Sequence, residues 1–238
     1  MRSETPAPND RTAEPASTFA GGSEDRVLVL DQAAPHAIEW TAERIASGGV
    51  VAIPTDTVYG IAASLTYPDA LDRIYAIKGR PAQMPLPVLV SSAAALSHLV
   101  ELDDSIVPLI DAFWPGPLTV VLPATTRVPR QVLGPGDSIG VRLPSHPIAI
   151  EVIEKAGGAV ACTSANRSGG PPALTALEVA ESIGPELDLI LDSGNAPGGV
   201  ASTVVAIDGV ALRFIREGAL SMTEIIRIWD EINAPSRS

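Results

Sequence analysis

The stretch 49–60, GVVAIPTDTVYG, decides the fold class of this 238-residue chain. After its glycine it begins with a short continuous apolar run, which is typical of a strand covered on both faces of a sheet. Pro54 ends the run, and Thr55, Asp56 and Thr57 follow at once. Ligands of open α/β sheets bind beyond the carboxyl ends of strands, so these three side chains predict a binding site. The alternative is an ordinary turn in which they bond their own backbone.

Strand-like and helical segments alternate along the rest of the chain, which predicts a single α/β domain with its sheet covered on both faces. The first helix has Pro35 near its first turn and Gly48 past its end. A capping box that starts at Ser221 begins the last helix. We expect strands at 27–30, 49–53, 86–90, 118–122, 139–142, 159–161, 187–191, 203–207 and 211–215, and helices at 35–47, 68–77, 92–99, 104–113, 147–156, 175–182 and 221–232.

Residues 1–25 differ in composition from everything that follows them. They are rich in Pro, Ala, Ser, Thr, Glu and Asp and show no apolar periodicity. Such a segment cannot bury enough apolar surface to offset the entropy that it would lose on ordering. We therefore expect a disordered N-terminal tail at 1–25 and one folded domain at 26–238.

Charge and composition exclude several classes of protein. The net charge of −12 argues against binding of nucleic acid through a broad basic surface, although a local cluster of cations could still bind a small anion. No apolar run reaches the roughly 18 residues of a membrane-spanning helix, and the N-terminus has no signal-peptide pattern. Cys162 is the only cysteine, which fits a reducing compartment. We therefore expect a cytoplasmic protein with no membrane partner.

The cations of IYAIKGRP, residues 74–81, are the first candidates for an anion site. Lys78 lies seven residues after Leu71, in phase with the apolar face of its helix, so it should point into the core or into a cleft. Arg80 follows the break that Gly79 makes in the helix. Two cations at the edge of a core favour phosphate as their ligand. The alternative for Lys78 is a cap on the C-terminus of the helix.

Polar side chains also lie at the ends of later strands. Arg142 ends a strand and could grip a carboxylate or phosphate, or form a surface ion pair. The loop at 161–172, ACTSANRSGGPP, offers hydroxyls, an amide and backbone N–H groups to a nucleotide, although an ordinary polar loop has the same composition. The chain has no P-loop, no H-E-x-x-H and no cysteine pair. Together the strand ends predict one polar cleft with a local positive charge, formed by Thr55, Thr57, Lys78, Arg80, Arg142, Ser164, Asn166, Ser202 and Arg216.

These residues stand in seven blocks whose order resembles the YrdC family. The blocks are GGVVAIPTDTVYGIAA, IYAIKGRP with PLPVLV, WPGPLTVVLP, IGVRLPSHP, TSANRSGGPP, DSGNAPGGVASTVVAID and IREGAL. Within them, Lys78-x-Arg80 and Ser164-x-Asn166 match the signature of the family. The resemblance runs from about residue 38 to residue 220.

The resemblance implies a YrdC-like fold, in which a twisted mixed sheet with flanking helices surrounds an open cleft, in the short, single-domain form of the family. It implies a nucleotidyltransferase that makes threonylcarbamoyl-AMP and pyrophosphate from ATP, L-threonine and bicarbonate. A separate tRNA threonylcarbamoyl transferase complex would then modify the adenosine beside the anticodon. The resemblance also implies Mg²⁺ carried by ATP without a dedicated protein cage, and a weak contact with RNA.

Position by position, the resemblance assigns Thr57, Arg142 and Ser202 to threonine, with Arg142 on the carboxylate of the substrate. Lys78 and Arg80 would be the catalytic residues, through their grip on the phosphates. The implied ATP-binding residues are Lys78, Arg80, Ser138, Cys162, Ser164, Asn166 and Arg216.

Three positions depart from the family pattern. Asp56 stands where many members have Glu, and Met84 and Leu89 stand where some relatives have Asn and His. In those relatives the Asn and His contact ATP and threonine, so the resemblance leaves these two contacts open in this chain and the others undisturbed. Two alternatives stay open: a paralogue that uses a different amino acid, and a non-catalytic module that binds double-stranded RNA in the same cationic cleft.

Overall fold

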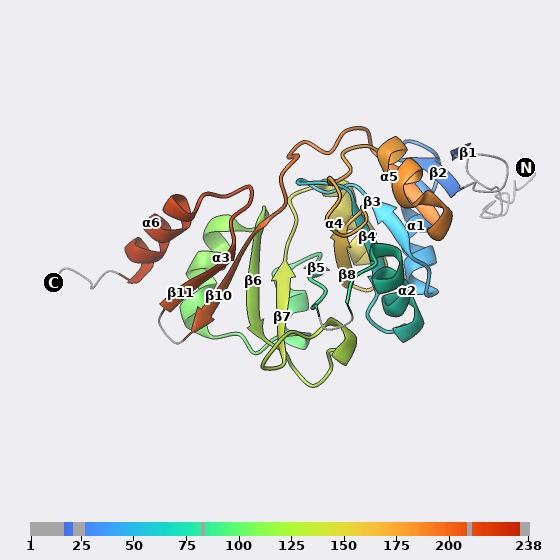
Figure 1. Cartoon of the computed structure of the whole chain (residues 1–238). Helices are drawn as coiled ribbons and strands as arrows, with labels where there is room; N and C mark the ends of the chain where they lie inside the picture. The colour runs from blue at the N-terminus through green and yellow to red at the C-terminus, as the bar shows by residue number, and fades with distance from the viewer. Residues whose placement is uncertain (1–16, 21–26, 82–83, 209–210, 234–238) are drawn as a thin grey trace, which may run out of the picture.

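The computed structural model describes residues 17–20, 27–81, 84–208 and 211–233. Within them the strands form one mixed sheet in the order β1-β2-β9-β3-β4-β8-β5-β7-β6-β10-β11. The labelled strands of Figure 1 follow this order across the view, from β11 on the left to β1 on the right. The strands are β1 (Ser17–Ala20), β2 (Val27–Asp31), β3 (Val51–Ile53), β4 (Gly60–Ser64), β5 (Val88–Val90), β6 (Leu118–Pro123), β7 (Ser138–Arg142), β8 (Ala159–Ser164), β9 (Leu189–Asp192), β10 (Thr203–Asp208) and β11 (Ala211–Arg216).

Helices cover both faces of the sheet, as the continuous apolar strands predict. Side chains of β3 alternate between the two faces: Val51 and Ile53 pack in a cluster with α1 and α4, whereas Ala52 packs in the larger cluster on the other face. Figure 1 places α3 and α6 beside β10 and β11, and α1, α2 and α5 towards the other end. The α-helices are α1 (Ala37–Ala46), α2 (Pro68–Lys78), α3 (Val107–Phe113), α4 (Pro147–Lys155), α5 (Ala176–Ile183) and α6 (Met222–Asn233).

Every strand and helix expected from the sequence is present, with small shifts at the ends. The segment 92–99 forms a 3-10 helix, η1 (Ala93–His98), and the helix expected at 104–113 begins with another, η2 (Asp104–Ile106). Two further 3-10 turns are η3 (Arg130–Val132) and η4 (Gly184–Glu186). None of the helices in the described ranges is both long and apolar enough to cross a bilayer.

Strand β4 was not expected from the sequence. It pairs antiparallel with β3, with Ile53 opposite Gly60, so the residues after Pro54 form the connection of a hairpin. Its sequence, GIAAS, is rich in small residues with weak strand propensity, which hides it from pattern analysis. The polar residues at the mouth of β3 are therefore held between two paired core strands.

Strand β1 corrects the prediction of a disordered tail at 1–25 for the four residues Ser17–Ala20. They pair antiparallel with β2, from Ser17 opposite Leu30 to Ala20 opposite Val27. The edge of β2 offers backbone N–H and C=O groups, and these pair whatever the side-chain composition of the added strand. The rest of the expected tail, 1–16 and 21–25, lies outside the described residues.

Candidate functional site

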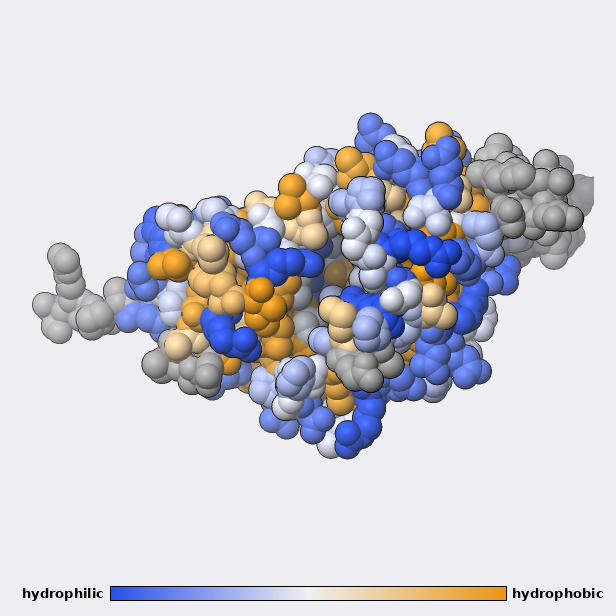
Figure 2. Space-filling view, viewed as in Figure 1, coloured by the Kyte–Doolittle hydropathy of each residue, from blue (hydrophilic) through white to orange (hydrophobic). Residues whose placement is uncertain are grey.

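A cavity of about 490 Å³ opens where β8, β5, β7, β6 and β10 lie next to one another in the sheet. Figure 2 shows this face of the molecule hollowed near its centre, with apolar surface on the side of β10 and β11. The volume is in the range of small-molecule binding sites. Eight of the ten residues assigned by the resemblance line the cavity: Thr57, Arg80, Ser138, Arg142, Cys162, Ser164, Ser202 and Arg216.

Strand β7 supplies one wall because its side chains alternate. Ser138, Gly140 and Arg142 are two residues apart, so all three face the cavity. A Cβ atom at Gly140 would lie 3.3 Å from the methyl carbon of Thr119 on the neighbouring strand β6. Glycine at this position therefore keeps the wall open between two polar residues.

Thr55 forms the turn between β3 and β4. Its hydroxyl donates to the carbonyl of Val58 at 2.6 Å and accepts from the N–H groups of Thr57 and Val58, both at 3.2 Å. This is the backbone-bonding turn that the sequence left open as an alternative. For Thr55 that alternative is correct, and the hydroxyl serves to shape the loop.

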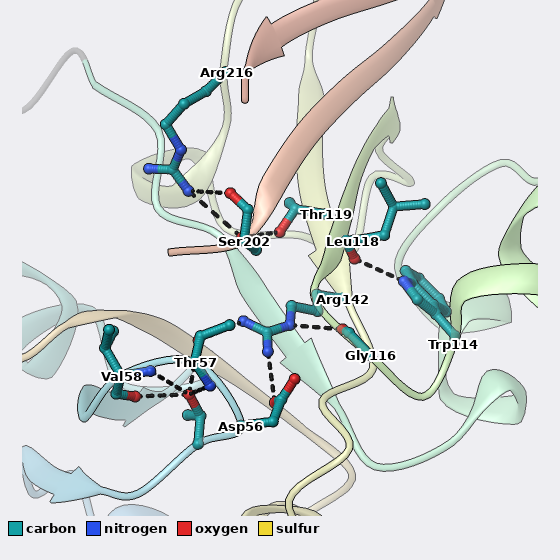
Figure 3. Close-up of polar contacts among 11 residues, drawn as sticks. Asp56, Thr57, Val58, Trp114, Gly116, Leu118, Thr119, Arg142, Ser202 and Arg216 are labelled. Carbon is teal, nitrogen blue, oxygen red and sulfur yellow. Dashed lines mark hydrogen bonds and ion pairs between the residues drawn. The ribbon is translucent and has the colours of Figure 1, made fainter. Parts of the chain in front are cut away.

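Asp56 and Thr57 turn away from their own backbone and meet Arg142 instead. The guanidinium of Arg142 donates from Nη2 to Asp56 Oδ1 at 2.5 Å, from Nη1 to Thr57 Oγ1 at 3.1 Å and from Nε to the carbonyl of Gly116 at 2.9 Å. Figure 3 shows the arginine reaching from its strand to the hairpin loop. The ion pair is buried, with side-chain exposures of 6% and 11%. The alternative of a surface ion pair at Arg142 is therefore wrong.

Arg142 keeps hydrogen-bonding capacity for a ligand. An arginine has five N–H donors, and the contacts with described residues use three of them. One N–H on each of Nη1 and Nη2 is left over, and the side chain lines the cavity. A carboxylate or phosphate could accept hydrogen bonds from both of these N–H groups. Asp56 would meanwhile keep the guanidinium in place.

Ser202 and Arg216 form a second polar unit across the cavity. Ser202 Oγ lies 2.8 Å from the hydroxyl of Thr119, and Arg216 Nη2 donates to the carbonyl of Ser202 at 2.8 Å (Figure 3). Thr203, the next residue, accepts from the N–H groups of Gly218 and Leu220 and donates to the carbonyl of Leu220. The loop after β11 is thereby tied to the start of β10.

Gly218 makes this tie possible, and we expect Gly218→Ala to lower the free energy of unfolding by about 1–3 kcal/mol. An added Cβ would lie 2.2 Å from the carbonyl oxygen of Ala201 and 2.6 Å from that of Ser202, and backbone cannot give way cheaply. Urea unfolding would measure the loss. Gly134→Ala is the control, because its Cβ would meet nothing closer than 3.4 Å. Equal stability of both variants would contradict the expectation.

A β-bulge in β11 brings a further cation to the cavity. Val205 pairs with Phe214 whereas Val204 pairs with Arg216, so Ile215 is an extra residue in the strand. Arg213 and Arg216 are an odd number of residues apart and would face opposite sides of a regular strand. With the bulge, both line the cavity. Strand alternation applied to the sequence alone would place Arg213 on the face opposite Arg216, which is why the sequence did not indicate Arg213.

Lys78 and Asn166 are the two assigned residues that do not line the cavity. Both are buried, with 4% and 7% of their surface exposed. The ammonium of Lys78 donates to the carbonyl of Ser164 at 2.6 Å, to its hydroxyl at 3.1 Å and to Asn166 Oδ1 at 3.0 Å. The inward direction read from the helical phase of Lys78 is confirmed, and a surface cap on its helix is excluded.

Arg80 reaches the cavity because α2 stops just before it. Gly79 has a left-handed φ of 58°, and the N–H of Arg80 turns back to the carbonyl of Tyr75 at 3.0 Å. Nη2 of Arg80 donates to the carbonyl of Pro85 at 2.9 Å, whereas Nε is buried without a hydrogen-bond partner among the described residues. A buried N–H donor without a partner costs free energy, and an anion bound in the cavity could accept from it.

The cations lie close enough to affect one another. Burial and then the charge of Arg80 lower the pKa of Lys78 to about 8. Burial, followed by Arg80 and Arg142, lowers the pKa of Arg216. The local field of the cleft is therefore positive although the protein carries a net charge of −12.

Cys162 and Leu89 form an apolar part of the same cavity. Burial raises the pKa of the Cys162 thiol to about 12, so it stays protonated at neutral pH. Leu89 is buried, and it is opposite Arg142 in the parallel pairing of β5 with β7. Met84, the other departure from the family pattern, is 49% exposed and does not line the cavity.

Sequence reasoning missed one polar cavity residue besides Arg213. Thr119 is buried in β6, within the quoted block WPGPLTVVLP. Thr119 and Val121 are two residues apart, so they share one face of the strand, and both line the cavity. This spacing was the available signal. Thr163 also lines the cavity from the end of β8, and it belongs to the loop 161–172 whose hydroxyls the sequence offered to a nucleotide. In the part of the chain that the structure describes, no three His, Cys, Asp or Glu side chains gather into a metal-binding group.

Comparison with known proteins gives one family. The model of Sua5/YciO/YrdC, which carries the description telomere recombination, matches residues 43–218. The Threonylcarbamoyl-AMP synthase of Pyrococcus abyssi is 40% identical over 189 residues, which cover 79% of this chain and 56% of that protein. The Threonylcarbamoyl-AMP synthase of Halorhodospira halophila is 38% identical over 158 residues, which cover 66% of this chain and 83% of that protein.

A solved structure has the same fold. The crystal structure of P. abyssi Sua5 complexed with L-threonine superposes with a TM-score of 0.79 at 37% identity and covers 84% of this chain. The match takes in 59% of that protein. This chain thus corresponds to little more than half the length of the P. abyssi protein.

Proposed function

Because this chain belongs to the Sua5/YciO/YrdC family, we propose that it is a threonylcarbamoyl-AMP synthase. The observation that carries the proposal is that one cavity joins two kinds of polar group. Arg142 and Thr57 suit an amino acid at one wall, and Arg80 and Arg216 suit phosphates. A single pocket that brings a carboxylated amine and a triphosphate together is what this reaction needs.

The amino-acid end is built around Arg142. Its two unused N–H donors would hold the carboxylate of threonine, while Asp56 and Gly116 fix the plane of the guanidinium. The hydroxyl of Thr57 donates to Thr55 and accepts from Arg142, which leaves one lone pair for the ammonium of the substrate. Ser202 would bind the hydroxyl of threonine from the opposite wall.

The ATP end would use Arg80, Ser138, Ser164 and Arg216, with Cys162 lining the pocket through its backbone. The guanidinium groups would neutralise phosphate charge, and the hydroxyls would donate to phosphate oxygens. Apolar surface from Val121 and Val204 on the same face would suit the base. The donor set is cationic and hydroxylic, which does not fit a resident divalent cation. Mg²⁺ would arrive as part of the MgATP substrate.

The reaction requires that the protein position its substrates, and it needs no covalent intermediate with the protein. The amine of threonine adds to carbon dioxide from bicarbonate and loses a proton, which gives a carbamate. A carbamate oxygen then forms a bond to the α-phosphorus, and the bond from that phosphorus to the bridging oxygen breaks, so pyrophosphate leaves with the electron pair. Fixed cations around the phosphates would stabilise the charge that develops. The product would pass to a tRNA threonylcarbamoyl transferase complex, and the protein would then work in the cytoplasm.

Pyrophosphate release with MgATP, bicarbonate and each amino acid in turn tests the proposal. We expect release that depends on threonine and on bicarbonate. Release with another amino acid would support the paralogue, which the apolar side chain of Leu89 beside Arg142 favours as the second candidate. Binding of double-stranded RNA without any turnover of ATP would support the non-catalytic module, against which the net charge of −12 argues.

Substitution of Arg213 tests the proposed ATP-binding part of the cavity through a small expected effect. We expect Arg213→Gln to raise the KM for ATP by up to about fivefold, because its side chain is exposed at the rim and screened by water. The KM for threonine should not change, and the effect should shrink as salt is added. Arg227→Gln on α6 is the matched control, an exposed arginine paired with Glu231 and absent from the cavity lining. Equal effects of both substitutions would contradict a role for Arg213.

A further inference from the structure

The ammonium of Lys78 has no donor left for a phosphate. A lysine has three N–H donors, and the three acceptors on Ser164 and Asn166 use all of them. No carboxylate of the described residues forms an ion pair with Lys78. The charge is therefore held by neutral oxygens of one loop, away from the cavity surface.

Asn166 likewise has no N–H donor left. Its Oδ1 accepts from Lys78, and its Nδ2 donates to the carbonyl of Arg167 at 2.9 Å and to that of Gly170 at 2.7 Å. The amide thus links the lysine to the middle and to the far end of a tight loop. We call residues 164–170 the support loop, because Ser164 at its start is the residue that lines the cavity.

The support loop also closes over the end of α2. The N–H of Ser168 donates to the carbonyl of Lys78 at 2.9 Å, and Nη1 of Arg167 donates to that of Ile77 at 3.0 Å. These are carbonyls of the last helical turn, which otherwise lack partners within the helix. Lys78 therefore binds the same loop twice: its side chain donates to the loop, and its backbone carbonyl accepts from it.

We propose that Lys78 is a positioning residue: together with Asn166 it holds the support loop so that Ser164 faces the triphosphate, and it does not itself bind phosphate. That the ligand is a triphosphate rests on the proposed function. That Lys78 and Asn166 hold the support loop does not. Arg80, two residues further on and with an orphaned Nε, is then the residue of this pair that touches the ligand. The lowered pKa of Lys78 agrees with a cation that lacks a counter-charge in the free protein.

The first test needs no substrate. Hydrogen exchange of the ligand-free protein should show faster exchange at Ser168 and Gly170 in Lys78→Met than in the natural chain. The amide of Ser168 bonds the carbonyl of Lys78, and that of Gly170 bonds the carbonyl of Arg167, so both bonds depend on the held loop. Lys155→Met is the matched control, because Lys155 is the only other lysine and lies on the surface beside Glu39 and Glu151. Unchanged exchange at 168 and 170 in Lys78→Met would overturn the proposal.

The second test is a double-mutant cycle on turnover. Lys78→Met and Asn166→Ala should each raise the KM for ATP by about tenfold to a hundredfold and leave the KM for threonine within about twofold. The double variant should be hardly worse than either single one, because both act through one loop. Additive effects, or a rise in Lys78→Met alone, would mean that Lys78 binds phosphate directly and would overturn the proposal.

The two tests separate this proposal from the function itself. If no amino acid supports release of pyrophosphate in the natural chain, the proposed function fails while the exchange experiment still decides the role of Lys78. If Lys78→Met does not fold, Asn166→Ala decides alone: unchanged exchange in the support loop and an unchanged KM for ATP would refute the positioning role.

Discussion

Arg142→Met is expected to remove the threonine-dependent release of pyrophosphate and to lower the free energy of unfolding by about 3–5 kcal/mol. The loss has two sources. The substrate carboxylate loses its only proposed guanidinium partner, and Asp56 is left as a buried carboxylate whose ion pair is gone. Thr57 and the carbonyl of Gly116 lose a donor at the same time. Turnover and urea unfolding measure the two losses separately.

The control for Arg142→Met is Arg73→Met. Arg73 also forms an ion pair, with Asp188, but its side chain is 42% exposed and lies outside the cavity lining. We expect a loss of about 0–1 kcal/mol and normal turnover. Restored stability without restored turnover in Asp56→Asn combined with Arg142→Met would assign the stability loss to the stranded carboxylate. Normal turnover in Arg142→Met itself would refute the amino-acid site.

Arg80→Ala is expected to lower kcat/KM for ATP by about 100-fold or more while the fold stays intact. Arg80 is half-buried, and the one hydrogen bond that its side chain makes with described residues goes to the carbonyl of Pro85. Little stability therefore depends on it, whereas its orphaned Nε has no partner until a ligand arrives. Pyrophosphate release at varied MgATP measures the effect.

Arg227→Ala is the matched control for Arg80→Ala, since it removes a guanidinium from the exposed face of α6. It should leave both kcat and KM unchanged. Arg80→Lys should recover only part of the activity, because an ammonium lacks the fork of a guanidinium. Near-normal kcat/KM in Arg80→Ala would show that Arg80 is not a phosphate ligand.

The two variants also distinguish the halves of the cavity. Loss of Arg142 should raise the KM for threonine most, and loss of Arg80 the KM for ATP, because each guanidinium faces a different polar unit. A variant that raised both constants equally would indicate a general disturbance of the sheet. The geometry argues against this, since Arg142 is held by the hairpin loop of β3 and β4, and Arg80 by the end of α2.

Local physical rules account for what the sequence predicts well. Continuous apolar strands, the helical phase of Lys78 and the glycine that ends α2 depend on residues within a few positions of one another. The resemblance to a family adds the expected roles, and most of the assigned residues do line one cavity. The pattern fails at β4, whose small residues carry a weak strand signal, and at β1, which needs the edge of β2.

The amino-acid sequence by itself determined that this is an α/β protein with cations and hydroxyls at its strand ends, since periodicity and local propensity are written in neighbouring residues. Only the tertiary structure decided which of those groups face the ligand. The bulge turns Arg213 into the cavity, and long-range hydrogen bonds use all three N–H donors of Lys78 beneath it. Whether a donor is free depends on partners more than 80 residues away along the chain, and no local pattern specifies them.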